Sequence, residues 1–428
     1  MNKIKSIFAS FKGWCKSLFV KTGENEPKLL SAIKTGTFQS IFASVIAACC
    51  GLIFGLLLMM IVDSSVAWKG FTSLLQGASK SGLKGVGNTL FFAVPLIMTG
   101  LSVGFAFKTG LFNIGAVGQF AMGIFCSLYA AYHFEAGWVV CLLCGMVGGM
   151  VWGAIPGIFK AIFNVNEVIT SIMTNYIGMY LIDMLIIQDP IMYNSNYGWT
   201  YSLSDYANLP KWGLDTLFGG GYINSGIIIA IAIAIAMYLL LNKTTIGYEL
   251  KACGTNKDAA RYSGINEKRN IILAMVIAGG LAGIGGAMEI QAGAGNYYSP
   301  VNALRDEGFN GIAVALLGVS NPIGIIFAAI FFSHLEQGGI YLQAVGYSSD
   351  IIQVIMGVVI YFSALALLFK NLIPTLIKKF GKDDKDNANA VSAEEFAENK
   401  AEAENIINEK SVEETADIAK TQNEKEVE

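Results

Sequence analysis

The stretch GLFNIGAVGQFAMG, from Gly110 to Gly123, interrupts a long hydrophobic region with polar and small residues. It carries the amides Asn113 and Gln119 together with four glycines. Lipid offers no hydrogen-bond partner to an amide or to loosened backbone, so such a segment must face protein or water. The stretch therefore predicts a membrane protein with a polar place between its helices, used either for packing or for the passage of a polar solute.

The composition around this stretch agrees with that prediction. The chain is 54% hydrophobic and 14% charged, whereas roughly 25% of the residues in a soluble domain are charged. Its apolar runs have the length of bilayer spans, about 20 residues each. We predict an all-α polytopic membrane protein with about ten transmembrane segments, at 38–62, 89–107, 111–132, 138–160, 166–188, 222–241, 271–291, 306–318, 322–342 and 350–370.

The eighth segment, 306–318, is too short to cross lipid by itself. Nine spans would leave Lys370, Lys378 and Lys379 outside, against the preference of lysine and arginine for cytoplasmic loops. Ten segments return these lysines to the cytoplasm. We therefore expect 306–318 to be a short span covered by its neighbours, and both termini to be cytoplasmic.

The two ends of the chain differ from the transmembrane domain, 38–370. Residues 1–37 alternate lysines with apolar residues at helical spacing, which predicts a basic amphipathic segment lying on the lipid bilayer. Residues 371–428 are rich in Glu, Lys, Asn and Ala and are strongly acidic, which predicts a disordered cytoplasmic tail. The remaining basic residues lie in loops between spans, so we predict no nucleic-acid partner.

Glycines recur every four residues in several segments. The clearest row lies in 138–160, and shorter rows lie in 271–291 and 38–62. Such rows occupy one helix face and let another backbone approach closely. They predict a tightly packed bundle, and they comprise Gly145, Gly149, Gly153 and Gly157, then Gly279 and Gly283, and Gly51 and Gly55.

The cysteines and histidines predict no metal site. Cys141 and Cys144 have the spacing of a redox or metal motif, but apolar residues surround them. Small buried residues are the favoured interpretation of this pair. The only histidines are His133 and His334, so a histidine-rich metal site is excluded.

The loop 242–270, LNKTTIGYELKACGTNKDAARYSGINEKRN with its flanking Leu241, is the longest predicted cytoplasmic connection. Its glycines divide it into two short helical pieces, and Thr255 or Asn256 is placed to cap the second. A short surface helix with small residues fits a groove on another protein, and we favour docking over an ordinary charged loop. The candidate docking residues are Gly247, Tyr248, Glu249, Leu250, Gly254, Asn256, Ala259, Ala260 and Gly264.

Several blocks, taken in order, resemble one family. They are FKTGLFNIGAVGQ (107–119), NEVITSIMTNYI (166–177), IGYELKACGTNKDAARYSGIN (246–266), NIILAMVIAGGLAGIGGA (270–287), GFNGIAVALLG (308–318) and NPIG (321–324). Between about 38 and 370 the chain resembles a permease subunit of bacterial ATP-binding-cassette (ABC) importers of the simple-sugar and nucleoside type, which belong to the branched-chain-type permeases. It is most similar to the longer permease of nucleoside importers. Val117 departs from the pattern, because the family usually has an acid there.

The resemblance implies a type II ABC-importer-like permease fold in a bacterial cell membrane. It also implies that the chain works as one of two permeases that together form the path. Loop 242–270 would be received by an ATPase, and an extracytoplasmic substrate-binding lipoprotein would deliver nucleoside. The chain has no G-x-x-x-x-G-K-[ST] phosphate loop. We therefore expect no enzyme activity and no cofactor in this chain, with ATP and magnesium held by the partner ATPase.

The candidates for the substrate path are Phe112, Asn113, Gln119 and Asn175. Asn113 and Gln119 are six residues apart, which places them about 240° apart on a continuous helix. They converge only if the glycines break the helix. Amides donate and accept hydrogen bonds without trapping a charge, which suits a nucleoside. Interhelical hydrogen bonding is an equally weighted interpretation.

Other functions stay open at this point. A simple-sugar importer has the same architecture, and a proton-coupled carrier would use Asp183 and Glu289 near the predicted outer ends of their spans. The cluster Arg305, Asp306 and Glu307 either neutralises itself or gates the outer mouth. The aromatic stretch 189–221 is either an interfacial belt or a docking surface for an extracytoplasmic partner. We find no nucleophile with its base within the spans, which argues against an intramembrane enzyme.

Overall fold

The computed structural model describes residues 36–293 and 295–365. The predicted N-terminal segment, apart from its last two residues, and the predicted acidic tail lie outside the described residues. So does the end of the tenth predicted segment, 350–370.

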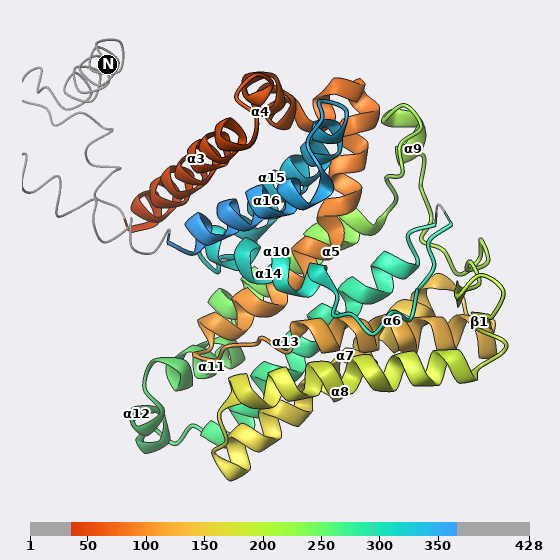
Figure 1. The fold of residues 1–428 in the computed structure, drawn as a ribbon. Coiled ribbons are helices and arrows are strands. Elements are labelled where there is room, and N and C mark those ends of the chain that lie inside the picture. Colours follow the sequence, from red (N-terminus) through yellow and green to blue (C-terminus); the bar gives the residue numbers. More distant parts are fainter. Residues whose placement is uncertain (1–35, 294, 366–428) are drawn as a thin grey trace, which may run out of the picture. The chain divides into compact units, whose positions relative to one another are not determined.

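The described residues form helices, with one two-stranded antiparallel hairpin in the long connection between α8 and α10 (Figure 1). This confirms the all-α prediction. The elements are α3 (Gly36–Val62), α4 (Ala67–Gln76), η1 (Gly77–Ser81), α5 (Gly82–Lys108), α6 (Ala116–His133), α7 (Trp138–Phe163), α8 (Glu167–Gln188), β1 (Tyr193–Asn194), β2 (Trp199–Thr200), α9 (Leu214–Leu217), α10 (Gly226–Lys243), α11 (Thr245–Thr255), α12 (Lys257–Tyr262), α13 (Glu267–Ile290), α14 (Asp306–Leu317), α15 (Pro322–Gln343) and α16 (Ser349–Ala364).

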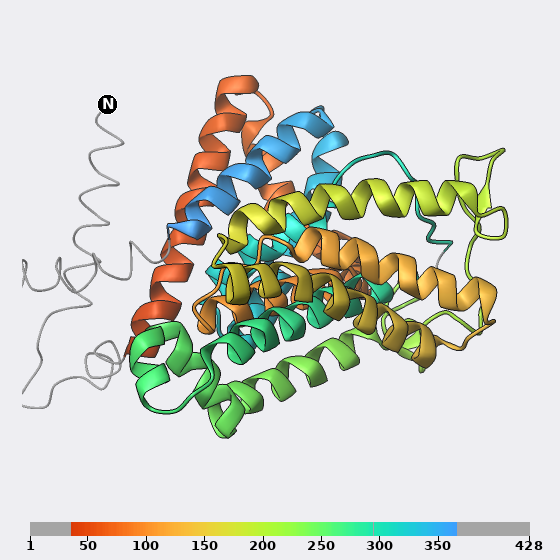
Figure 2. The ribbon, with the colours of Figure 1, turned by 90° about the horizontal axis from the view of Figure 1, so that it is seen from below.

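Two helices, α5 and α13, form the centre of the described bundle. Most of their side chains are buried, whereas α3, α7 and α10 expose apolar faces suited to lipid. α13 packs against α7, α6 and α5, and α5 packs in turn against α14 and α15. Both views place α11 and α12 at one end of the bundle and the hairpin at the other (Figures 1 and 2). We name these the α11–α12 end and the hairpin end.

The predicted glycine rows of α7 and α13 face each other. A methyl group on Gly279 would lie 2.3 Å from the carbonyl oxygen of Gly149, and one on Gly283 would lie 2.3 Å from that of Gly145. Gly123 of α6 approaches Gly283 equally closely. The prediction of tight backbone packing is therefore confirmed for this group of helices. Gly55 of α3 differs, because it faces the side chain of Ile355.

Seven described helical segments are long and apolar enough to cross a membrane. They include every predicted span except three, which correspond to α6, α14 and α16. α14 has 12 residues and is about 18 Å long, so it cannot cross the roughly 30 Å of hydrocarbon. It packs against α5, α15, α16 and α6, which confirms a short segment covered by its neighbours.

Some boundaries predicted from the sequence were wrong. The connection 63–88 contains α4, η1 and the first turns of α5, whose amphipathic and glycine-rich sequences lack a continuous apolar run. The third predicted segment, 111–132, begins later, at Ala116. The aromatic stretch 189–221 contains the hairpin and α9.

Candidate functional site

Helical structure is interrupted between α5 and α6, at the α11–α12 end; we call this interruption the α5–α6 break. α5 ends at Lys108 and α6 begins at Ala116. Gly110 has a φ of 75°, a left-handed conformation that glycine adopts without a Cβ penalty. The amide of Leu111 then donates to the carbonyl of Ala106 and closes the end of α5. The polar stretch seen in the sequence is therefore a connection between two helices, followed by the first turns of α6.

This break brings Asn113 and Gln119 together. Nδ2 of Asn113 donates to Oε1 of Gln119 at 2.8 Å, and Nε2 of Gln119 donates back to Oδ1 of Asn113 at 3.1 Å. Asn113 also donates to the hydroxyl of Ser102 at 3.1 Å. Both amides are fully buried. The convergence that required a broken helix is thus present.

Asn175 of α8 holds the start of α6. Its Oδ1 accepts from the amide of Gly118 at 2.9 Å, and its Nδ2 donates to the carbonyl of Ile114 at 3.0 Å. These contacts satisfy backbone groups that a helix end leaves without intrahelical partners. Phe112 stacks on Phe107 with ring centroids 4.9 Å apart. The four path candidates therefore surround one break, and the three amides must release their present partners before they can bind a solute.

The loop 242–270 folds into α11 and α12, as its glycines predicted. The Thr244 hydroxyl accepts from the amide of Gly247 at 3.1 Å and caps α11. Oδ1 of Asn256 accepts from the amide of Ala259 at 3.0 Å and caps α12, which confirms Asn256 as one of the two predicted caps. Gly264 follows α12 with a φ of 81°.

Gly254 places this loop directly against the break. A methyl group on Gly254 would lie 2.4 Å from the carbonyl carbon of Thr109 and 2.6 Å from the amide nitrogen of Gly110. One on Gly110 would lie 2.4 Å from the Cα of Gly254. Two glycines distant in sequence thus meet backbone to backbone. A displacement of α11 must therefore move the connection that carries Asn113.

The candidate docking residues divide into an inner and an outer group. Gly247, Leu250 and Ala260 are buried and hold the loop against the bundle, whereas Tyr248 is 69% exposed. The remaining members are exposed or half-buried: Glu249, Gly254, Asn256, Ala259 and Gly264.

Tyr262, at the end of α12, is 94% exposed and was not among the predicted docking residues. The sequence could have indicated Tyr262, because an aromatic residue within a polar loop is not expected to be buried in the chain's own core. Exposed tyrosines often anchor protein interfaces.

The carboxylates assigned to a carrier mechanism lie at the hairpin end. Asp183 is buried and accepts from the hydroxyl of Tyr298 and the amide of Asn302, each at 2.8 Å. Burial, together with the negative charge of Asp183, raises the pKa of Tyr298, so the hydroxyl stays protonated and donates. Asp183 therefore anchors the connection between α13 and α14.

Nη1 of Arg305 lies 3.8 Å from Oε1 of Glu289, and its Cζ lies 4.7 Å from the ring centre of Tyr298. Among the described residues it forms no ion pair with its sequence neighbours Asp306 and Glu307. Of the two interpretations left open for this cluster, self-neutralisation is therefore wrong, because Arg305 lies against Glu289 of α13 instead.

Comparison with known proteins agrees with this architecture. The family described as "Branched-chain amino acid transport system / permease component" matches residues 85–364. The nucleoside ABC transporter permease NupB of Lactococcus lactis is 35% identical, over 78% of this chain and 94% of that protein. The guanosine ABC transporter permease NupP of Bacillus subtilis is 33% identical, over 79% and 97% respectively. The glucose ABC transporter permease TsgB13 of Haloferax volcanii is 31% identical, over 67% and 77%.

No solved structure matches the chain. The family match begins in α5 and ends in α16, and thus includes both the α5–α6 break and the loop that contacts it. The resemblance inferred from the sequence blocks is confirmed, and this multi-pass membrane protein belongs to the permease family of the branched-chain amino acid transport systems.

Proposed function

We propose that this chain is the permease subunit of an ABC importer that forms the translocation path for nucleosides. One structural observation carries the proposal: the backbone contact of Gly254 with Gly110 joins an exposed docking loop to the buried amides of the path. The names of two relatives, a nucleoside and a guanosine permease, support the substrate class. A simple-sugar importer is the second candidate, supported by the glucose permease among the relatives.

The partners follow from this assignment. The α11–α12 end lies in the cytoplasm, where an ATPase subunit receives α11 and α12 and holds ATP and magnesium. A second permease completes the path, and a substrate-binding lipoprotein delivers nucleoside at the hairpin end. The exposed aromatic residues of that end suit such docking, because aromatic side chains are enriched at protein interfaces.

The geometry suggests how ATP-driven movement reaches the path. Movement of the ATPase displaces α11, and the close contact at Gly254 transmits the displacement to the α5–α6 connection. The Asn113–Gln119 pair then opens and offers donors and acceptors to the base and the ribose hydroxyls. When the path closes, the two amides pair with each other again. They therefore have hydrogen-bond partners in both the open and the closed state.

Reconstitution tests the function. The chain is placed in liposomes with its ATPase, second permease and lipoprotein, and uptake of radiolabelled guanosine and glucose is measured with and without internal ATP. We expect guanosine uptake that requires both ATP and the ATPase. Uptake of glucose alone would establish the sugar importer, and guanosine uptake driven by a proton gradient without the ATPase would establish a carrier.

The amide pair gives a prediction for the path. We expect Asn113→Ala and Gln119→Ala to lower guanosine uptake about tenfold at equal amounts of folded complex, since each removes an uncharged hydrogen-bonding group worth on the order of 1 kcal/mol and breaks the reciprocal pair. Gln291→Ala is the matched control, because Gln291 is also a fully buried amide but donates to the carbonyl of Trp138 at the hairpin end. Uptake equal to that of the control variant would assign the pair to packing alone.

The exposed tyrosine of α12 gives a prediction for docking. We expect Tyr262→Ala to weaken binding of the purified ATPase to the permease about tenfold, the loss typical of an aromatic interface anchor. The dissociation constant is measured in nanodiscs. Tyr206→Ala is the control, because Tyr206 is 71% exposed in the connection that follows the hairpin. Equal affinities of the two variants for the ATPase would remove Tyr262 from the interface.

A further inference from the structure

A cavity of about 440 Å³ lies within the bundle toward the hairpin end. Its walls come from α5, from the connection before α10, from the end of α13 with the chain that follows it, and from α14 and α15. This volume is within the range of small-molecule sites, about 300–1,000 Å³. The polar side chains that line it are Asn224, Glu289, Asn296, Glu307, Asn310 and Glu336.

The three glutamates require a polar occupant. Oε2 of Glu289 is buried without a hydrogen-bond partner, and its Oε1 has only the 3.8 Å contact with Arg305. Among the described residues, Glu307 and Glu336 form neither hydrogen bonds nor ion pairs. Carboxylates at membrane depth face a water-filled space or a bound solute, because exposure to hydrocarbon is costly. The cavity is therefore rich in acceptors that the chain itself does not satisfy.

Aromatic rings form the other part of the lining. Phe91 of α5 lies beside Tyr222, with ring centroids 6.0 Å apart. Tyr297, also in the lining, stacks on Trp199 at 4.6 Å, and Trp199 stacks on Tyr197 at 5.4 Å. These rings lead from the surface hairpin to the cavity. Flat rings offer a nucleobase a stacking surface that does not depend on its hydrogen-bonding edge.

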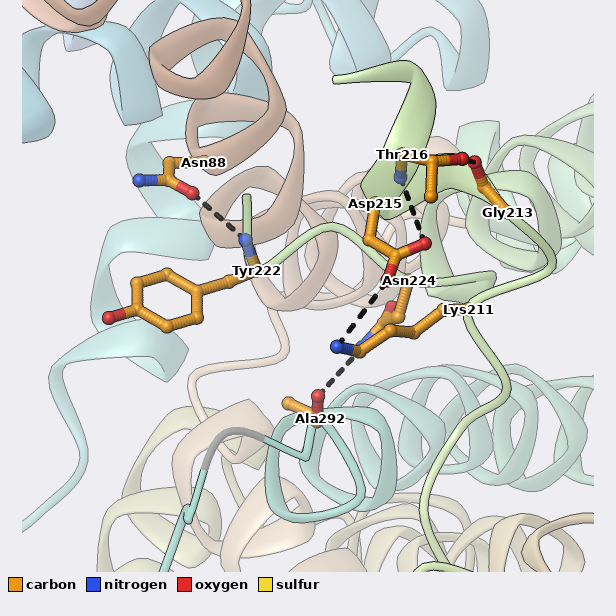
Figure 3. A network of polar contacts seen from close by, with 8 residues as sticks. All are labelled: Asn88, Lys211, Gly213, Asp215, Thr216, Tyr222, Asn224 and Ala292. Atoms are coloured by element: carbon orange, nitrogen blue, oxygen red, sulfur yellow. Dashed lines mark hydrogen bonds and ion pairs between the residues drawn. The ribbon is translucent and has the colours of Figure 1, made fainter. Parts of the chain in front are cut away.

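The wall that carries Tyr222 is fixed at two points (Figure 3). The backbone amide of Tyr222 donates to Oδ1 of Asn88 at 3.0 Å, which ties the wall to α5. Nδ2 of Asn224 donates to the carbonyl of Ala292 at 3.1 Å, which ties it to the chain after α13. Asn224 also accepts from the amide of Gly226. The cavity is therefore bounded by a segment held in place by hydrogen bonds.

We propose that this cavity is an outer nucleoside-binding subsite, occupied before the solute reaches the α5–α6 break. The inference rests on the proposed function. Glu307 and Glu336 accept hydrogen bonds from the ribose hydroxyls and the base N–H groups, and the aromatic rings stack on the base. The described residues of the lining include no lysine, arginine or histidine to hold a phosphate group, which disfavours phosphorylated nucleotides. The cavity thus selects a neutral solute rich in hydrogen-bond donors.

Guanosine and 2′,3′-dideoxyguanosine test the subsite in the reconstituted complex. We expect Glu307→Gln and Glu336→Gln together to lower kcat/KM for guanosine about tenfold, since each substitution replaces an acceptor oxygen by an NH2 group that cannot accept from a hydroxyl or an N–H. The preference for guanosine over the dideoxy analogue falls at the same time. Asp306→Asn is the matched control, because Asp306 precedes Glu307 in the first turn of α14 but does not line the cavity.

The outcomes separate this inference from the proposed function. No guanosine uptake by the wild-type complex overturns the function. Wild-type guanosine uptake, with the double variant equal to Asp306→Asn in both rate and preference, overturns the subsite alone.

A second measurement decides the matter if the double variant does not fold. Asn310→Cys places a thiol in the cavity lining, and its labelling by an impermeant methanethiosulfonate is followed against the wild-type background. Guanosine delivered by the lipoprotein is expected to slow labelling at least threefold. Labelling unaffected by guanosine overturns the subsite.

Discussion

Replacing Gly254 by valine is expected to lower guanosine uptake at least tenfold while the permease stays folded in the membrane. The valine Cβ would lie 2.4 Å from the carbonyl carbon of Thr109. Backbone atoms cannot rotate aside as a side chain does, so α11 must separate from the α5–α6 connection. Overpacking of this kind costs about 1–3 kcal/mol. This cost disrupts only the contact between α11 and the α5–α6 connection, whereas the central helices stay packed.

The measurements for this variant separate coupling from assembly. Uptake, ATP hydrolysis and ATPase binding are followed in the same reconstituted complex, and we expect hydrolysis and binding to persist while uptake is lost. Gly357→Val in α16 (Ser349–Ala364) is the control, because Gly357 is also a helical glycine but has open space where the new side chain would lie. It adds the same side chain to a helix without a backbone contact. Normal uptake by Gly254→Val would show that the contact does not transmit movement.

This contact marks the limit of what the sequence could predict. Both partners were visible in the sequence, Gly110 within the polar stretch and Gly254 in the docking loop, and topology placed them on the same side of the membrane. Their direct contact depends on how α10 and α13 direct the loop across the end of α5, which no local pattern encodes.

Local signals predicted most of the fold. Runs of apolar residues located the principal helices, and the cap of α12 followed from Asn256 and the small residues after it. α4 was missed because its pattern is amphipathic, as in a surface helix, and lacks the continuous apolar run of a span. The hairpin was missed because each of its strands has only two residues.

The sequence predicted where the candidate site lies, but only some of the contacts that its residues make. From the sequence, Asn113 and Gln119 could converge only if the glycines broke the helix, and the structure shows that break. The sequence did not predict that Asn175 would clamp the first turn of α6. The sequence analysis named Glu289 and Glu307 separately and did not name Glu336. It could not group them into one cavity, because the three glutamates belong to three different helices. Their convergence is a property of helix packing.

The glycine rows show how packing and the site depend on each other. α7 and α13 meet at Gly145, Gly149, Gly279 and Gly283, and the closeness of their backbones lets α6 reach Gly283 as well. α6 carries Gln119, and α13 leads from α12 to Glu289. Van der Waals packing drives helix association in lipid, because the tails offer no hydrophobic gain. The three helices that connect the loop, the break and the cavity thus rely on small residues.

Replacing Gly283 by leucine is therefore expected to prevent formation of the folded permease. The Cβ of the new side chain would lie 2.3 Å from the carbonyl oxygen of Gly145 and 2.9 Å from the Cα of Gly149. Both neighbours are backbone, so α7 and α13 must move apart and lose contacts along their length. We expect the free energy of unfolding to fall by more than the usual overpacking cost of about 1–3 kcal/mol. The measurement is the fraction of monodisperse protein and its thermal unfolding in detergent.

The matched control is Gly357→Leu in α16, a helical glycine with open space where the new side chain would lie. Leucine is a better helix former than glycine, so this variant is expected to unfold at or above the wild-type temperature. The two substitutions add the same apolar side chain to a helix and differ in what surrounds it. Equal thermal stability of the two variants would mean that the backbone contact between α7 and α13 is not what holds the bundle together.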